Sequence, residues 1–119
     1  MKIFFKKSLE TLEDSRIALE NERYNMSVNR SYYACFYAAK SLLLKKGQIQ
    51  KTHSGTIQQF GLEYVVNNDF DGEIAKIFSF LEDYRENTDY DAYFNATKEK
   101  ASENLKNAEI FIGECERFL

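Results

Sequence analysis

Apolar residues recur along most of this chain at the three- and four-residue spacing that places them on one face of an amphipathic helix. Short polar segments separate these stretches. The pattern predicts five helices, at about residues 2–20, 24–45, 52–67, 71–86 and 95–118. The apolar stripes that define four of them are Phe5, Leu9, Leu12 and Leu19; Ile57, Phe60 and Tyr64; Ile74, Ile77, Phe78, Leu81 and Tyr84; and Ala101, Leu105, Ala108, Ile112, Cys115 and Leu119.

The second predicted helix differs from the others because its middle, residues 32–39, is apolar or aromatic on all sides. Neighbours contact most of the surface of such a helix, so we expect it at the centre of the molecule. Two lysines followed by Gly47 are typical of a helix C-terminus. The next helix begins at Thr52 or Ser54, since either hydroxyl can cap its first turn.

The composition favours an all-α protein. The chain has 119 residues, no proline and only five glycines, which is too little turn chemistry for a sheet of many strands. This length is typical of a single domain, which we expect to cover residues 1–119. No stretch approaches the roughly 18 consecutive apolar residues of a membrane span, and the first residues lack the apolar core of a secretion signal. We therefore expect a cytoplasmic protein that does not bind a membrane.

Metal ligands are few in this sequence. Cys35 and Cys115 both fall on apolar helical stripes, and with only one histidine in the chain they cannot form a standard zinc site. The acidic residues at 82–83 and 89–91 offer too few converging oxygens for calcium or magnesium. We expect inert core thiols, no metal and no cofactor. The net charge of −3 argues against a generally basic surface, although a local patch can still bind phosphate.

Arg85 is the first candidate functional residue. Counting back from it at helical spacing gives Leu81, Phe78 and Ile74, so Arg85 continues the buried stripe and its guanidinium should emerge at the edge of the core. A polar turn is expected to follow at residues 86–91. Two interpretations remain open: Arg85 binds an anionic ligand, or it interacts with the dipole and the last carbonyls of its own helix.

His53 and Arg30 are further candidates. His53 opens the third predicted helix, where backbone amides favour an anion, so it can serve as a general base or a phosphate ligand. The alternative is a structural histidine that stabilises the loop. Arg30 precedes the apolar run of the second helix, and a partly buried arginine there needs a carboxylate such as Asp83, Asp89 or Asp91.

Three ordered motifs together resemble the HEPN domain superfamily: NRSYYACFYAAK at residues 29–40, KTHSG at 51–55 and RENTDYD at 85–91. The resemblance covers essentially the whole chain and is greatest to a prokaryotic subfamily with a Thr-His-Ser-Gly helix start and an arginine followed by an Asp-Tyr pair. It implies an antiparallel bundle of four to five helices, usually a homodimer, often encoded beside a minimal nucleotidyltransferase as a toxin-antitoxin pair.

The resemblance also implies a site. Active members resemble metal-independent endoribonucleases with an arginine followed four to six residues later by a histidine, and two such sites face each other across the dimer interface. Arg85 matches the arginine, but Tyr90 stands where the histidine would be. Members regulated by their nucleotidyltransferase are adenylylated on a tyrosine two residues after that histidine, where this chain has Ala92, followed by Tyr93.

The missing histidine matters for the chemistry. A phenol with an ordinary pKa near ~10 is a poor proton acceptor at neutral pH, so Tyr90 is a weak substitute for an imidazole. The resemblance therefore suggests that Arg85 holds the scissile phosphate, Tyr90 orients it, and His53 supplies the base if the fold brings it near.

Two functional hypotheses follow. In the first, the protein binds RNA or a nucleotide at a dimeric cleft that these three residues line together with Asn87, Asp89 and Arg30, and this function can extend to metal-independent cleavage of RNA. In the second, the chain is a non-catalytic partner domain that docks a nucleotidyltransferase and helps to bind its nucleotide.

Overall fold

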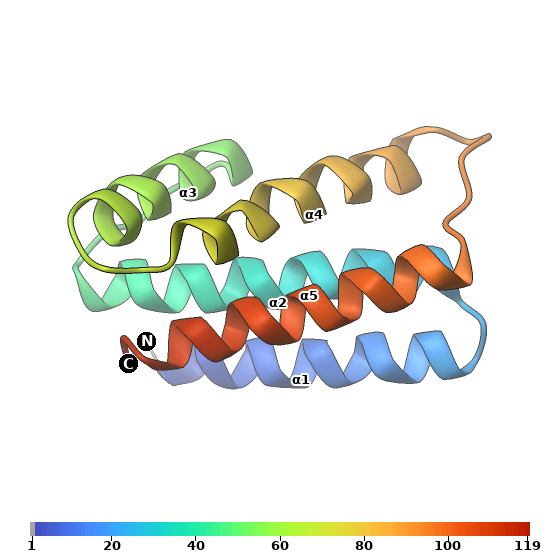
Figure 1. The fold of residues 1–119 in the computed structure, drawn as a ribbon, viewed down its shortest axis with the longest axis horizontal. Helices are drawn as coiled ribbons and strands as arrows, with labels where there is room; N and C mark the ends of the chain where they lie inside the picture. The colour runs from blue at the N-terminus through green and yellow to red at the C-terminus, as the bar shows by residue number, and fades with distance from the viewer. Residues whose placement is uncertain (1) are drawn as a thin grey trace.

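A computed structural model describes residues 2–119 and shows an all-α protein, with no strand among those residues. The helices are arranged as an antiparallel bundle (Figure 1). The predicted fold class is therefore confirmed. In chain order the elements are α1 (Lys2–Glu20), α2 (Tyr24–Lys45), α3 (His53–Phe60), the π-helical segment η1 (Gly61–Val66) that continues α3, α4 (Gly72–Tyr90) and α5 (Lys98–Glu116).

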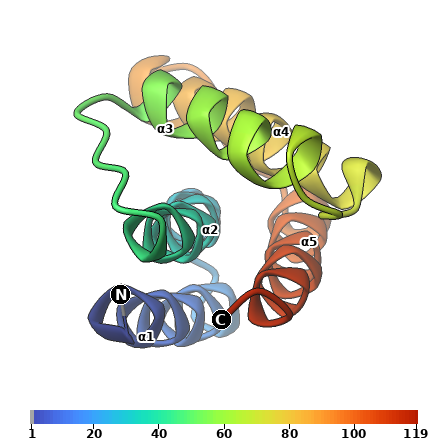
Figure 2. The same ribbon diagram turned by 90° about the vertical axis from the view of Figure 1, so that its left-hand side faces the viewer.

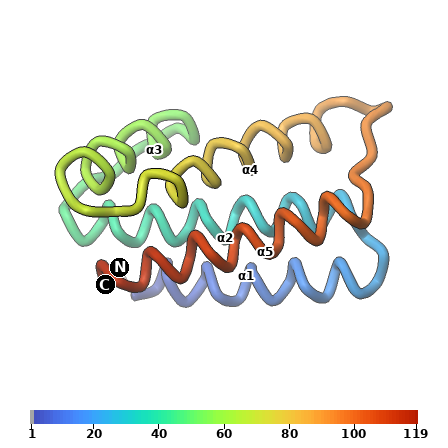
Figure 3. Tube along the Cα trace, in the orientation of Figure 1, coloured from blue at the N-terminus to red at the C-terminus, as the bar shows by residue number. Residues whose placement is uncertain are grey.

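The second helix lies at the centre, as its all-round apolar sequence predicted. It contacts each of α1, α3, α4 and α5. Seen end-on, α1, α2 and α5 form a group of three helices, and α3 and α4 lie above it (Figure 2). The connection at residues 46–52 carries the chain back along α2, so that α3 begins over the middle of α2 and then runs antiparallel to α4 (Figure 3). This return path positions the first residue of α3, His53, inside the bundle's length rather than at its end.

The helix ends follow ordinary capping chemistry. Gly47 adopts a positive φ of 73° after α2, in agreement with the predicted stop. Thr52, rather than Ser54, caps α3, because its hydroxyl accepts a hydrogen bond from the Gly55 amide at 2.9 Å. The fit around Gly55 is close, since a Cβ there would lie 2.7 Å from the Thr52 hydroxyl oxygen. The start of α3 is thus fixed by one threonine and one glycine that touch each other.

The interface between α1 and α2 is built largely from small hydroxyl side chains. Ser15 hydrogen-bonds to Ser27 and Ser31 at 2.9 and 2.8 Å, and Ser8 donates to the Ala34 carbonyl at 2.6 Å. Because these groups satisfy one another, α1 can bury polar positions against α2 without a desolvation penalty for each hydroxyl. The stripe predicted for α1 is therefore partly wrong: Leu9 is 44 % exposed.

Aromatic side chains fill the other side of the core. Rings from α3, η1, α4 and α5 pack face to face or edge to face, as at Phe60 with Tyr64 and with Phe78, whose centroids lie 5.5 and 6.0 Å apart. Cys35 and Cys115 are fully buried free thiols in this core. Burial raises the pKa of both thiols, which keeps them protonated and unreactive.

Among the helices of residues 2–119, none combines the length and apolarity that crossing a membrane requires.

Two leucines of α1 test whether burial follows the structure or the apolar stripe predicted from the sequence. Leu12 is only 5 % exposed, so Leu12→Ala should lower the free energy of unfolding by about 2–5 kcal/mol. Leu9→Ala should lower it by less than about 1 kcal/mol, because Leu9 already contacts water. Urea denaturation of the two variants measures both values. Equal losses would show that Leu9 is buried as the stripe suggests.

Candidate functional site

The polar turn expected after Arg85 is absent, because α4 continues to Tyr90. No glycine or proline interrupts residues 86–90, and an ion pair between Arg85 and Asp89, four residues apart, supports the added turn. The last helix correspondingly begins later than predicted, at Lys98, with Thr97 as its cap. Arg85 therefore lies within a helix and does not act on the last carbonyls of α4. Its partners are side chains.

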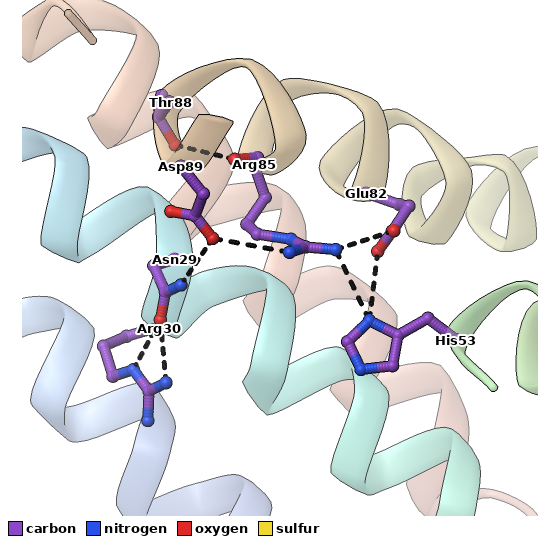
Figure 4. Close-up of polar contacts among 7 residues, drawn as sticks. All are labelled: Asn29, Arg30, His53, Glu82, Arg85, Thr88 and Asp89. Atoms are coloured by element: carbon purple, nitrogen blue, oxygen red, sulfur yellow. Dashed lines mark hydrogen bonds and ion pairs between the residues drawn. The ribbon is translucent and has the colours of Figure 1, made fainter. Parts of the chain in front are cut away.

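Arg85 is the centre of a polar cluster between α2, α3 and α4 (Figure 4). Its side chain is only 3 % exposed, and one terminal nitrogen, Nη2, donates to Glu82 at 2.7 Å. The other, Nη1, lies 3.4 Å from Asp89. The guanidinium carbon is 4.8 Å from the centre of the Tyr32 ring and 5.6 Å from that of Tyr33. The arginine is thus enclosed by two carboxylates and two aromatic faces, which is the environment that a buried guanidinium requires.

His53 joins this cluster from α3. Its Nδ1 atom lies 3.4 Å from Arg85 Nη2 and 4.0 Å from Glu82 Oε2. The ring centre is 4.8 Å from that of Phe36 and 5.5 Å from that of Tyr33. The fold therefore brings His53 next to Arg85, the condition on which its predicted role as a base depends, although 32 residues separate them in the chain. The histidine side chain remains 37 % exposed, which makes it the more accessible member of the pair.

The tautomer of His53 decides what it can do. If Nδ1 accepts from Arg85, then Nε2 carries the proton and can donate to a ligand. If Nδ1 carries the proton, it faces Glu82 Oε2, which has no hydrogen-bond partner within residues 2–119. The second arrangement leaves Nε2 free to accept a proton, with the carboxylate orienting the ring. Nε2 points away from both partners in Figure 4.

The charges of the cluster stabilise one another. Burial works against ionisation of Glu82, but the hydrogen bond and charge of Arg85, together with the nearby Tyr32 hydroxyl, outweigh it, so the pKa of Glu82 is lowered. Burial likewise opposes the charge of Arg85, but the hydrogen bond to Glu82 and its negative charge raise the pKa of Arg85. Burial and the nearby Glu82 carboxylate raise the pKa of Tyr32. Arg85 and Glu82 therefore form a permanent ion pair at neutral pH.

A second set of polar contacts extends the cluster along α2. Asn29 donates to Asp89 at 3.0 Å, and its side-chain oxygen accepts two hydrogen bonds from Arg30, at 3.0 and 2.7 Å. The predicted carboxylate partner for Arg30 is wrong, because Arg30 forms no ion pair within residues 2–119 and bonds to an amide instead. Asn29 thus separates the guanidinium of Arg30 from the carboxylate of Asp89, which is already shared with Arg85.

The other predicted site residues lie at different distances from this centre. Tyr90 is 79 % exposed, and its ring centre is 5.9 Å from the Arg85 guanidinium carbon, so it borders the cluster. Asn87 is not brought to the cluster, because it lines a separate hollow of about 290 Å³ between α4 and α5, together with Lys100 and Asn104. Within residues 2–119, no group of three or more metal-binding side chains gathers in one place.

Sequence reasoning missed Glu82 and Tyr33 as parts of the site. Glu82 could have been found from its position three residues before Arg85, a spacing at which opposite charges meet on a helix. No local signal identifies Tyr33, because its role depends on where the loop after α2 brings α3. The complete arrangement offers an accessible imidazole held by an arginine and a carboxylate, beside aromatic rings, which is suited to binding and proton transfer at a phosphate ester.

A family model for the HEPN domain matches residues 1–118. This chain belongs to the HEPN domain family. Two HEPN relatives from Methanocaldococcus jannaschii, each named "Putative toxin", are 35 % identical over 113 residues and 37 % identical over 111 residues. The alignments cover 95 % of this chain and 77 % of the first relative, and 92 % of this chain and 81 % of the second. A "UPF0332 protein" from Thermotoga maritima is 32 % identical over 114 residues, which is 96 % of this chain and 86 % of that protein.

The buried ion pair of this HEPN domain should dominate the cost of mutating its site. Arg85→Met leaves the Glu82 carboxylate buried without its partner and should lower the free energy of unfolding by about 3–5 kcal/mol. Adding Glu82→Gln removes the orphaned charge, so the double variant should regain part of that loss. Arg16→Met is the matched control, because Arg16 pairs with exposed carboxylates and should cost about 1 kcal/mol or less. Urea denaturation measures the three values, and an equal loss for Arg85 and Arg16 would contradict the buried pair.

The lowered pKa of Glu82 also predicts a pH dependence. A carboxylate whose pKa is lower in the folded state stabilises the fold above its unfolded pKa, and the stabilisation is lost as pH falls towards the folded pKa. The free energy of unfolding should therefore decrease between about pH 5 and pH 3, around the ordinary glutamate value. In Glu82→Gln the decrease should be smaller. Denaturation series at several pH values compare the two slopes, and identical slopes would exclude Glu82 as a contributor.

Proposed function

We propose that this protein is a toxin-type HEPN protein that binds RNA at the cluster around Arg85 and His53 and cleaves it without a metal ion. The observation that carries the proposal is the 3.4 Å approach of His53 Nδ1 to Arg85 Nη2. The family resemblance implies a site that pairs an arginine with a histidine, and in this chain the histidine is supplied by α3 instead of α4. The names of the two archaeal relatives support the toxin-type role.

In this proposal His53 is the proton acceptor. In cleavage of RNA by its own 2′-hydroxyl, the 2′-oxygen bonds to the adjacent phosphorus while the bond from phosphorus to the 5′-oxygen of the next nucleotide breaks, and that oxygen leaves with a proton. The step needs a group that accepts the hydroxyl proton and can return a proton to the leaving oxygen, and an imidazole can do both. His53 is the accessible member of the cluster. It acts as the base in the tautomer in which Nδ1 carries its proton towards Oε2 of Glu82 and does not accept from Arg85, because Nε2 is then free to accept the proton. The exposed phenol of Tyr90 lies beside the guanidinium, where its hydroxyl can contact the phosphate.

Both terminal nitrogens of Arg85 already bond to carboxylates of the same chain. Its side chain is enclosed, and Nη2 is bound at 2.7 Å to Glu82. The contact of Nη1 with Asp89 is longer, at 3.4 Å, and Asp89 is the more exposed of the two carboxylates. A phosphate therefore reaches Arg85 from the Asp89 side, where displacing one weak contact frees Nη1 to donate to it. The homodimer and the nucleotidyltransferase partner that the resemblance implies belong to this proposal, since exposed Phe80 and Tyr90 on α4 offer apolar surface to a partner.

A second candidate function is a non-catalytic domain that docks a nucleotidyltransferase and helps to bind its nucleotide. One observation favours it: both terminal nitrogens of Arg85 are already held by carboxylates of the same chain. In that function the ion pairs are structural and the accessible surface of α4 contacts the partner.

The two candidates differ in their effect on RNA. Purified protein incubated with total RNA in a metal chelator should cleave it, and His53→Gln should slow cleavage by roughly a hundredfold or more while RNA binding is retained. Tyr90→Phe should have an intermediate effect. Ser54→Ala is the matched control, because Ser54 is the exposed neighbour of His53 and should change neither property.

Circular dichroism of each variant establishes that it is folded, and Arg85→Lys tests the bidentate contact while keeping the charge of the buried pair. Full cleavage by His53→Gln would remove His53 as the base. If the parent protein neither binds nor cleaves RNA, the ribonuclease proposal fails and the partner-domain function stands.

A further inference from the structure

A hollow of about 780 Å³ lies beside the Arg85 cluster, at the end of the bundle where α1 joins α2. Its walls include Arg23, which precedes α2, then Tyr24, Asn25 and Arg30 from α2, and Asn95 from the connection between α4 and α5. Its volume is within the range of small-molecule sites in proteins. The hollow also shares Asn29, Arg30 and Asp89 with the cluster, so the two are continuous.

This hollow is distinguished by two arginines that form no ion pair in the described part of the chain. The chain has five arginines, and three of them, Arg16, Arg85 and Arg117, form ion pairs with carboxylates. Arg23 and Arg30 form none within residues 2–119, and both line the hollow. Arg23 immediately precedes the first residue of α2 and Arg30 lies within that helix, and both contribute to the wall of the same hollow. Glu22 and Asp89 also line the hollow, but among the described residues neither forms an ion pair with these two arginines, so both guanidinium groups can bind an external anion.

The rest of the wall is suited to the other parts of a nucleotide. Asn25 donates to the side-chain oxygen of Asn95 at 3.4 Å and accepts from the Ala96 amide at 2.7 Å. The remaining N–H groups of the two side-chain amides can donate to the edge of a base, and Tyr24 adds a half-buried ring. Met26 is 59 % exposed and offers apolar surface between the two arginines. The carboxylate of Asp89 at the margin is already bound to Asn29 and Arg85.

Tyr33 connects the hollow to His53. Its ring centre lies 5.2 Å from the guanidinium carbon of Arg30, and its ring contacts that of His53 at 5.5 Å. The ring is half-buried, so one part of it stays accessible. A ligand that crosses Tyr33 passes from the two arginines of the hollow directly to the imidazole, and aromatic rings hold successive bases of single-stranded nucleic acid by stacking.

We propose that Arg23 and Arg30 form a phosphate-binding subsite for single-stranded RNA, with the strand running from this hollow across Tyr33 to His53. The proposal rests on the proposed function, because it names the form of RNA that the same site takes and where the neighbouring nucleotides bind. A strand held at both ends of this path has its backbone fixed relative to the imidazole, whereas a free mononucleotide can occupy only one end.

The test compares two double variants that remove the same charge. Arg23→Gln/Arg30→Gln removes both arginines of the hollow, and Arg16→Gln/Arg117→Gln removes two arginines that form ion pairs elsewhere. Binding of a labelled single-stranded RNA oligonucleotide is measured by fluorescence anisotropy at several salt concentrations. The hollow variant should bind at least about tenfold more weakly, the effect of removing one charged hydrogen bond. Its salt dependence should fall by about 0.7 in log-log slope for each RNA phosphate that the protein no longer binds. The control variant should bind like the parent.

Adenosine monophosphate as a competitor tests whether the site takes an extended strand or a single nucleotide. The mononucleotide should displace the oligonucleotide only at much higher concentration, because it can occupy only one part of the path between the hollow and His53. Equal affinity of the mononucleotide and the oligonucleotide would overturn the extended path.

Met26→Glu provides a second variant in case the Arg23→Gln/Arg30→Gln protein does not fold. Met26 is exposed, so the new carboxylate should pair with the arginines and weaken RNA binding without disturbing the fold. If the parent binds RNA and both hollow variants bind it equally well, the subsite is wrong while the proposed function stands. If the parent binds no RNA, the proposed function itself fails.

Discussion

The site of this protein depends on the ion pair between Arg85 and Glu82, which is buried where three helices meet. A charge in this position is costly to desolvate, and it is tolerated because the two opposite charges bond to each other at 2.7 Å and because aromatic faces of α2 cover the guanidinium. Once the pair is in place, the position of every other polar group nearby is restricted. Asp89 is attracted to the remaining nitrogen, and His53 is held against both charges. The pair therefore organises the cluster even though it is almost closed to solvent.

The helices themselves could be predicted from the sequence, because periodic burial decides where they lie. The central place of α2, the stop at Gly47 and the capping of α3 by a hydroxyl followed from local rules. The errors arose where a local rule competed with a tertiary contact. Leu9 fits the α1 stripe, but the serine hydroxyls pair with α2 and turn the helix so that Leu9 faces water. The extra turn of α4 is supported by the pair of Arg85 with Asp89, which a prediction based on apolar spacing does not weigh.

The candidate site was predicted only in part, for a related reason. Arg85 could be found because it continues a buried stripe, and His53 because it opens a helix. The distance between them depends on the path of residues 46–52, which turn back along α2, and no short-range pattern gives that path. Asn87 was predicted to line the cleft from a polar turn, whereas in the continuous helix α4 it lines a hollow against α5. Arg30 was assigned a carboxylate because burial was assumed, yet it remains partly exposed and bonds to the side-chain oxygen of Asn29.

The close contact between Gly55 and Thr52 has a consequence for how this sequence can vary. A Cβ at position 55 would lie 2.7 Å from the hydroxyl oxygen that caps α3, so any side chain there forces the threonine aside and loosens the first turn. His53 lies within that turn, and its ring would move with it. A substitution at Gly55 would thus displace the imidazole two positions earlier without touching it, so the local backbone couples the placement of His53 to the absence of a side chain at position 55.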